Sequence, residues 1–216
     1  MTAGRTRRLA IVATLLAAGI GGAGTALASE PSPQSGEGGG TLVIGKSFDL
    51  VTMDPGRMFE TTGGIIIPAM YDTLLTFQNN DVTEPMPGLA ESWEANEDAT
   101  EFTFTLRTDA VFSDGSPVEA ADVAFSLNRV RELKSSGAFL MEGVTAEAVD
   151  ASTVRLTTEA PNPALPRIMP TPTLGILNSD VVKENGGTDQ VGADTEDSAE
   201  EFLNATSAGS GPYMLE

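Results

Sequence analysis

Three stretches of the chain have the hydrophobic patterns of β-strands. Residues 101–107 (EFTFTLR) alternate strictly, so that Phe102, Phe104 and Leu106 fall on one face. Residues 153–158 alternate in the same way, and residues 41–45 (TLVIG) form a short apolar run that ends at a glycine. The alternating stretches predict half-buried strands, and the continuous run predicts a buried strand.

Three other stretches predict helices, namely residues 65–77, residues 120–134 and the short segment 200–203 (EEFL). In the two longer stretches, apolar residues recur at a spacing of three to four, which places them on one side of a helix. These apolar stripes are Ile67, Met70, Leu74 and Phe77 in the first stretch and Val123, Leu127 and Val130 in the second.

Turn-forming residues separate the predicted elements. Asp54-Pro55-Gly56 predicts a turn, and residues 85–88 (PMPG) predict a loop. Five prolines within residues 161–172 exclude a long regular element there. Residues 209–215 (GSGPYML) predict a further strand. Strands and helices therefore alternate irregularly, which predicts the α/β fold class in its mixed α+β form.

The first 28 residues have the features of a signal peptide. Three arginines (Arg5, Arg7 and Arg8) precede an unbroken run of apolar, glycine and threonine residues, and Ala26-Leu27-Ala28 gives the small-x-small pattern of a cleavage site. A membrane anchor is the alternative, but the run is mostly alanine and glycine. We therefore expect export to the periplasm, cell envelope or exterior with cleavage near Ala28, by the general secretory or the twin-arginine route. Residues 29–40 have no large apolar side chain and predict a flexible linker.

Composition excludes several classes of function. The 216-residue chain has a formal net charge of −19, which repels nucleic-acid backbones, so we expect no nucleic-acid partner. It contains no cysteine, which excludes disulfides, thiolate metal sites and a lipid anchor on cysteine. It contains no histidine, so the commonest general base and metal ligand is missing.

The candidate catalytic and metal-binding residues also have ordinary structural roles. The acids Asp114, Asp122, Glu91, Glu94 and Asp98 lie in turns or at helix starts, where carboxylates are common. The acidic stretch 189–197 lacks the alternating ligand pattern of a calcium loop, and the serines have no histidine to activate them. Trp93 is expected to pack in the core, with stacking on a ligand as the alternative. We therefore predict no catalytic residue, no metal site, no cofactor and no enzymatic activity.

Several segments, taken in order, resemble the extracellular solute-binding proteins for dipeptides, oligopeptides and nickel (family 5) that serve ATP-driven (ABC) importers. They are Asp54-Pro55, residues 67–75 (IPAMYDTLL), residues 87–93 (PGLAESW), residues 102–107 (FTFTLR) with 112–117 (FSDGSP) and 121–126 (ADVAFS), and residues 209–213 (GSGPY). The resemblance extends over residues 41–216. It implies a periplasmic-binding-protein-like fold, in which two lobes joined by a hinge enclose the solute. Members are normally more than twice this long, so we expect residues 41–216 to be the amino-terminal part of lobe I, with the chain ending before lobe II.

The same resemblance implies a function and a site. The function is capture of a small solute, with peptide as the expected class, and its delivery to ABC permease subunits by a monomer. The expected ligand-binding residues follow the first strand: Met58, Phe59, Glu60 and Thr61. Glu60 would face an ammonium group and Phe59 an apolar side chain; the alternatives are a solvated acid and a packed phenylalanine. With one wall of the site present, we expect weak binding or none. Two other functions remain open, a secreted carboxylate-dependent hydrolase and a secreted non-enzymatic scaffold.

Overall fold

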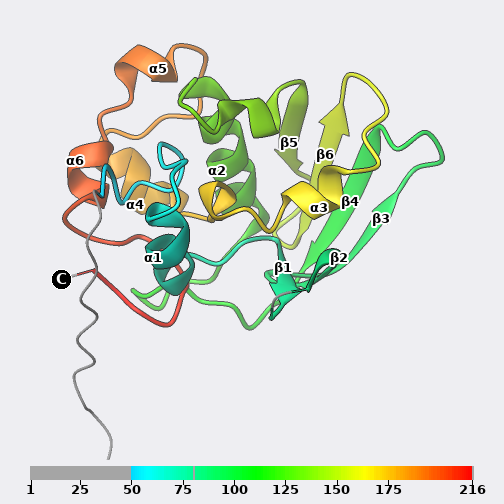
Figure 1. Cartoon of the computed structure of the whole chain (residues 1–216), viewed down its shortest axis with the longest axis horizontal. Coiled ribbons are helices and arrows are strands. Elements are labelled where there is room, and N and C mark those ends of the chain that lie inside the picture. The colour runs from blue at the N-terminus through cyan, green and yellow to red at the C-terminus, as the bar shows by residue number, and fades with distance from the viewer. Residues whose placement is uncertain (1–49, 80, 216) are drawn as a thin grey trace, which may run out of the picture. The chain divides into compact units, whose positions relative to one another are not determined.

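The computed structural model describes residues 50–79 and 81–215 (Figure 1). The predicted signal peptide (1–28), linker (29–40) and first strand (41–45) lie outside the described residues. Among the described residues, no helix is long and apolar enough to span a membrane.

A four-stranded antiparallel sheet forms one half of the fold. Its strands are β3 (Ala90–Ala95), β4 (Glu101–Leu106), β5 (Val144–Ala148) and β6 (Thr153–Thr158), in the spatial order β3-β4-β6-β5. The predicted strands at 101–107 and 153–158 are thus confirmed. Phe102, Phe104 and Leu106 are buried while the residues between them are half-buried, as the alternation requires.

Helix α2 (Ala120–Glu132) packs against β5 and β6 and confirms the second predicted helix. It begins with a capping box, in which the side chains of Glu119 and Asp122 each accept a hydrogen bond from the other residue's backbone N–H. Its predicted apolar stripe, Val123, Leu127 and Val130, is buried in the main hydrophobic core with the sheet. Trp93 is partly buried and packs against this core, in agreement with the structural expectation.

The predicted helix at 65–77 is only half right. Helix α1 (Gly63–Met70) ends at Met70, Tyr71 is extended, and strand β1 (Leu75–Gln78) follows. The helix ends because distant backbone groups bind the next residues: the carbonyl oxygens of Asp72 and Thr73 accept hydrogen bonds from Ile176 N (2.8 Å) and Leu89 N (3.1 Å). A local apolar stripe carries no information about such partners.

Residues 85–88, predicted as a loop, lie mostly in a strand. Strand β2 (Asp81–Pro87) pairs antiparallel with β1, and Pro87 lies opposite Leu75. Within residues 50–79 and 81–215, β2 pairs with β1 alone, and a residue without an N–H group is tolerated where a strand has no partner on one side. The predicted loop is therefore wrong for Pro85–Pro87.

A second hydrophobic core lies around α1, α4 (Ser179–Glu184) and α6 (Glu200–Leu203), which confirms the short helix predicted at 200–203. The proline-rich stretch contains only the short helices α3 (Leu165–Ile168) and η2 (Pro172–Leu174), as expected. The remaining short helices are η1 (Ala138–Met141) and α5 (Ala193–Glu196).

Residues 209–215 do not form the predicted strand, since they pair with a helix end rather than with a strand. Gly211 N and Tyr213 N donate to the last carbonyl groups of α1, on Met70 (2.9 Å) and Ala69 (3.0 Å). A Cβ atom at Gly209 would collide with the Met70 carbonyl oxygen, so glycine permits this close approach.

Candidate functional site

The four residues predicted to bind a ligand lie together on one loop. The Asp54-Pro55-Gly56 turn forms as predicted, with Arg57 N donating to Asp54 O at 3.1 Å, and the chain then passes through residues 58–61 into α1. Met58, Phe59, Glu60 and Thr61 all line one hollow of about 310 Å³, which we call the loop hollow. Its remaining lining residues are Gly64, Thr171, Pro172 and Thr173.

Two contacts of Met58 hold the loop in place against the rest of the fold. Thr173 donates from Oγ1 to the carbonyl oxygen of Met58 at 2.8 Å, and both side chains are buried. Gly63 at the start of α1 lies so close that a Cβ atom there would collide with the Met58 side chain. Met58 is therefore the floor of the loop hollow, while Thr61 is exposed.

Glu60 is the charged group of the loop hollow. Its Oε1 atom is buried and has no hydrogen-bond partner within residues 50–79 and 81–215. A buried carboxylate oxygen without a partner loses its hydration and gains nothing in return. The residue itself lines the loop hollow, so its carboxylate brings negative charge to this site, to which a cation or an N–H donor is attracted.

Phe59 forms an aromatic pair that the sequence did not indicate. Its ring lies 5.2 Å from that of Phe139 in η1, with the planes at 89°. The two side chains are 46% and 58% exposed, so this T-shaped pair presents apolar surface to solvent beside the loop hollow. Phe139 lies eighty positions further along the chain, and no local pattern connects it to the loop.

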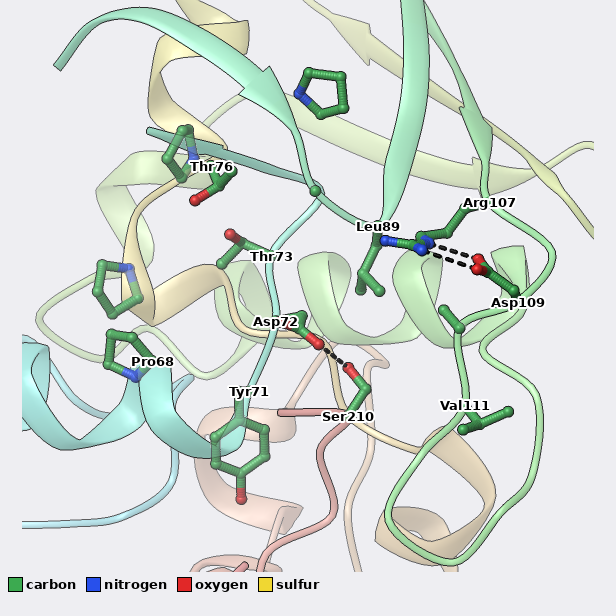
Figure 2. Close-up of a pocket in the computed structure, with 15 residues that line it drawn as sticks. Pro68, Tyr71, Asp72, Thr73, Thr76, Leu89, Arg107, Asp109, Val111 and Ser210 are labelled. Atoms are coloured by element: carbon green, nitrogen blue, oxygen red, sulfur yellow. Dashed lines mark hydrogen bonds and ion pairs between the residues drawn. The ribbon is translucent and has the colours of Figure 1, made fainter. Parts of the chain in front are cut away.

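A second and larger hollow, of about 500 Å³, adjoins the first one at Pro172, which lines both (Figure 2). It contains two polar pairs: Ser210 Oγ donates to Asp72 Oδ2 at 2.8 Å, and Arg107 donates to both carboxylate oxygens of Asp109 at 2.6 and 2.9 Å. The hydrogen bonds between the two side chains raise the pKa of Arg107 and lower the pKa of Asp109. Sequence reasoning did not identify this hollow, because its walls come from five separate parts of the chain.

The acids considered as catalytic candidates have structural partners or face solvent. Asp114 accepts from Ser116 N and Oγ in a turn, and these bonds lower its pKa. Asp122 is buried and accepts from Glu119 N and Ser179 N. Glu91, Glu94 and Asp98 are exposed on β3 and the turn after it. Within the described ranges, no group of three acidic residues has the arrangement of a metal site.

Comparison with known proteins gives a consistent result. Residues 84–216 match the family described as "Bacterial extracellular solute-binding proteins, family 5 Middle". The chain is 32% identical over 178 residues to the probable D,D-dipeptide-binding periplasmic protein DdpA of Escherichia coli K12, covering 81% of this chain and 33% of that protein. It is 34% identical over 124 residues to the periplasmic oligopeptide-binding protein OppA of the same organism, covering 57% and 22%. The chain thus spans a third or less of these relatives.

Solved structures show the same likeness in three dimensions. The periplasmic binding protein AgaA of Agrobacterium tumefaciens R10, solved with agropinic acid, matches with a TM-score of 0.61 and 30% identity, covering 76% of this chain and 30% of AgaA. The substrate-binding domain of an oligopeptide ABC transporter from Bacillus anthracis Ames matches with a TM-score of 0.58 and 28% identity, covering 62% and 29%. The predicted mixed α/β, periplasmic-binding-protein-like fold is therefore confirmed, as part of a lobe.

Proposed function

Because the chain belongs to the bacterial extracellular solute-binding proteins of family 5, we propose that it is the solute-capturing component of an ABC importer. In this role it binds a small solute outside the cytoplasm and presents it to the permease subunits in the membrane. The similar proteins are binding proteins rather than enzymes, and we extend this absence of catalysis to the chain. No observation favours the hydrolase or the scaffold.

Peptide is the solute class that we propose. The names of DdpA and OppA state dipeptide and oligopeptide binding. The complex of AgaA with agropinic acid shows that a protein of similar fold takes a solute of another kind, so the proposal concerns the class and not a particular peptide.

The loop hollow is the observation that carries this proposal. It combines the negative charge of Glu60 with the apolar surface of Met58 and Phe59. A carboxylate can bind the ammonium group of a peptide, while apolar surface beside it can bind the adjacent side chain. Phe139 extends the apolar part through its contact with Phe59.

These residues supply one wall of a binding site, so we expect weak binding by this chain. A fully enclosed site buries 70–90% of a ligand's surface, and one wall buries much less. We expect dissociation constants on the order of millimolar. When the peptide concentration is about ten times the dissociation constant, binding raises the free energy of unfolding by about 1.4 kcal/mol.

The test is a thermal melt of the chain with pools of di- and tripeptides, compared between the wild type and Glu60→Gln. The amide keeps the shape of Glu60 and removes its charge, so the peptide-induced rise in melting temperature should disappear in this variant. Glu97→Gln is the matched control, because Glu97 is exposed and lies outside both hollows. A wild-type melting temperature that no peptide pool changes would contradict binding by this chain. A peptide-induced rise in Glu60→Gln as large as in the wild type would show that Glu60 does not contact the peptide.

We further propose the arrangement that the sequence suggests: a signal peptide at 1–28, a flexible linker at 29–40, and the amino-terminal part of lobe I at 41–216. Support comes from the arginine-led apolar segment and its cleavage pattern. The mass of the exported protein tests it, since cleavage after Ala28 gives a chain that begins at Ser29. A mass that includes residues 1–28 would contradict the cleavage.

A further inference from the structure

Four charged side chains gather between α2 and the turn at Asp54. Arg129 donates from Nη1 and Nη2 to the two carboxylate oxygens of Asp54, at 2.8 and 2.6 Å. The same guanidinium donates from Nε and Nη2 to Asp197 at 2.8 and 2.9 Å. Arg57 Nη2 lies 3.1 Å from Asp197 Oδ1, which makes two acids and two bases. The side chains of Asp54, Arg129 and Asp197 have no exposed surface, so we call this group the buried ion cluster.

Stability alone does not account for such a cluster. Removing each charge from water costs several kcal/mol, and apolar residues of similar volume often stabilise a fold as well or better. What a guanidinium provides is geometry, because its planar fork bonds carboxylates in fixed directions. Here a single fork holds two carboxylates from sequence positions that are far apart, Asp54 and Asp197.

The buried ion cluster is connected directly to the loop hollow. The carboxylate of Asp54 also accepts a third hydrogen bond from within the turn, where Gly56 N donates to Oδ1 at 3.0 Å. The backbone of Asp54 also accepts from Met58 N at 3.0 Å. Ser135, just after α2, donates from Oγ to Gly56 O at 2.7 Å. Arg129 therefore holds the residue from which the turn is built, and the turn holds Met58.

We propose that Arg129 is a positioning residue for the solute-binding loop at Met58–Thr61. It acts through Asp54, whose place between α2 and the turn fixes the direction in which the chain enters the loop. Asp197 completes the cluster and holds the guanidinium from its other side. This inference rests on the proposed function of the loop, but the effect of Arg129 on the loop is measurable without any solute.

The experiment uses the methionine methyl groups of the full chain, labelled with ¹³C and observed by NMR. Met58 reports on the loop hollow, whereas Met141 and Met169 lie in the main core with the sheet. The variant is Arg129→Lys, which keeps the charge but has one ammonium group in place of the fork. We expect the Met58 signal to shift and broaden, while the signals of Met141 and Met169 stay in place.

Arg131→Lys is the matched control on the same helix. Arg131 lies two residues further along α2 and donates to Val144 O and Thr145 Oγ1 of β5, away from the loop. The chemical change is identical, so any general effect of lysine in α2 appears in both variants. We expect the Met58 signal to be unchanged in Arg131→Lys.

Two results would overturn the inference. The first is an unshifted Met58 signal in Arg129→Lys. The second is movement of Met141 and Met169 as large as that of Met58, which would indicate general loosening. If Arg129→Lys has no cooperative melt, the same methionine signals are measured in Asp197→Asn instead. The amide keeps the shape of the side chain while it removes one charge and one acceptor oxygen. An unchanged Met58 signal in Asp197→Asn would then overturn it.

A titration with Ala-Ala and Ala-Ala-Ala separates this inference from the proposed function. A response of the Met58 signal in the wild type supports solute binding at the loop. If Arg129→Lys reduces the correctly placed loop to about a tenth of the population, the peptide binds it about tenfold more weakly. A wild-type signal that ignores both peptides counts against the proposed function, while the solute-free spectra still decide the role of Arg129.

Discussion

Helix α2 separates two regions that are built on different principles. Towards the sheet it presents Val123, Leu127 and Val130, and the main core there is made of apolar side chains. Towards α1 it presents Phe125 and, one turn later, Arg129. The same helix thus contributes an apolar stripe to one region and a buried cation to the other.

The distribution of buried polar groups follows this division. The buried polar and charged residues of the described chain lie outside strands β3 to β6. They are Thr52, Asp54, Asp122, Ser126, Arg129, Thr173, Asn178, Ser179 and Ser207. Several join segments that are distant in sequence, as Ser126 does by accepting from Leu177 N at 2.9 Å.

The difference shows how this fold divides its tasks. Apolar packing is non-directional, so it stabilises the sheet region without fixing single atoms of a loop. Hydrogen bonds and ion pairs are directional, and they occur where the loop at Met58–Thr61 must be held. The predictions below test whether the two regions respond to substitution in these two ways.

The largest expected effect is in the sheet region. Phe104 has no exposed surface and lies between Trp93 and Val154 on the neighbouring strands. Phe104→Ala leaves a cavity in the core and should lower the free energy of unfolding by about 3–5 kcal/mol. Urea denaturation measures this change. Thr103→Ala, on the opposite face of β4, is the control, and an equal loss in both variants would contradict the assignment of faces.

A smaller loss is expected in the region around α1. Asp197→Asn weakens charged hydrogen bonds to Arg129 and Arg57, and should lower the free energy of unfolding by about 2 kcal/mol. The same urea titration measures it. Glu196→Gln removes a charge from the neighbouring exposed residue and should change little. A loss in Asp197→Asn no greater than in Glu196→Gln would mean that the buried ion cluster adds no stability.

The two regions should also differ in their response to acid. Burial raises the pKa of Asp197, but the hydrogen bonds and charge of Arg129, together with hydrogen bonds from Thr188 N and Arg57, lower it more, so the pKa lies below its usual value. The stabilisation is therefore complete above the unfolded pKa of about 3.9 and is lost as the pH falls through the lower folded pKa. Unfolding free energies between pH 6 and pH 3 should fall less steeply in Asp197→Asn than in the wild type. Phe104→Ala should keep the wild-type slope, and equal slopes in all three proteins would refute this account.

Sequence patterns were sufficient for the sheet region for a physical reason. In a strand with one solvated face, buried side chains recur every second residue, and in a helix with one apolar stripe they recur every three to four residues. Both spacings can be read from a short stretch of sequence. Hence β4, β6 and α2 were predicted with nearly correct bounds. Strands β3 and β5 alternate less clearly, since most of their residues are exposed, and were missed.

The region around α1 could not be predicted in this way, because its backbone groups form hydrogen bonds with segments that are distant in the sequence. The end of α1 at Met70, the strand at Pro85–Pro87 and the course of residues 209–215 all depend on hydrogen bonds between separate segments. The loop at Met58–Thr61 came from family resemblance. Its neighbour Phe139 and the cation at Arg129 gave no local signal, since an arginine in a helix is usually exposed.

The smallest expected effect separates positioning from stability most sharply. Ser135→Ala removes the hydrogen bond from Ser135 Oγ to Gly56 O and should lower the free energy of unfolding by only about 1 kcal/mol. Because Gly56 lies in the turn that leads to the loop, the Met58 methyl signal should still shift, although the melt barely changes. Ser136→Ala is the control, since Ser136 is the exposed neighbour. A Met58 shift of equal size in Ser136→Ala, or none in Ser135→Ala, would mean that the turn does not hold the loop and that the two regions differ in composition only.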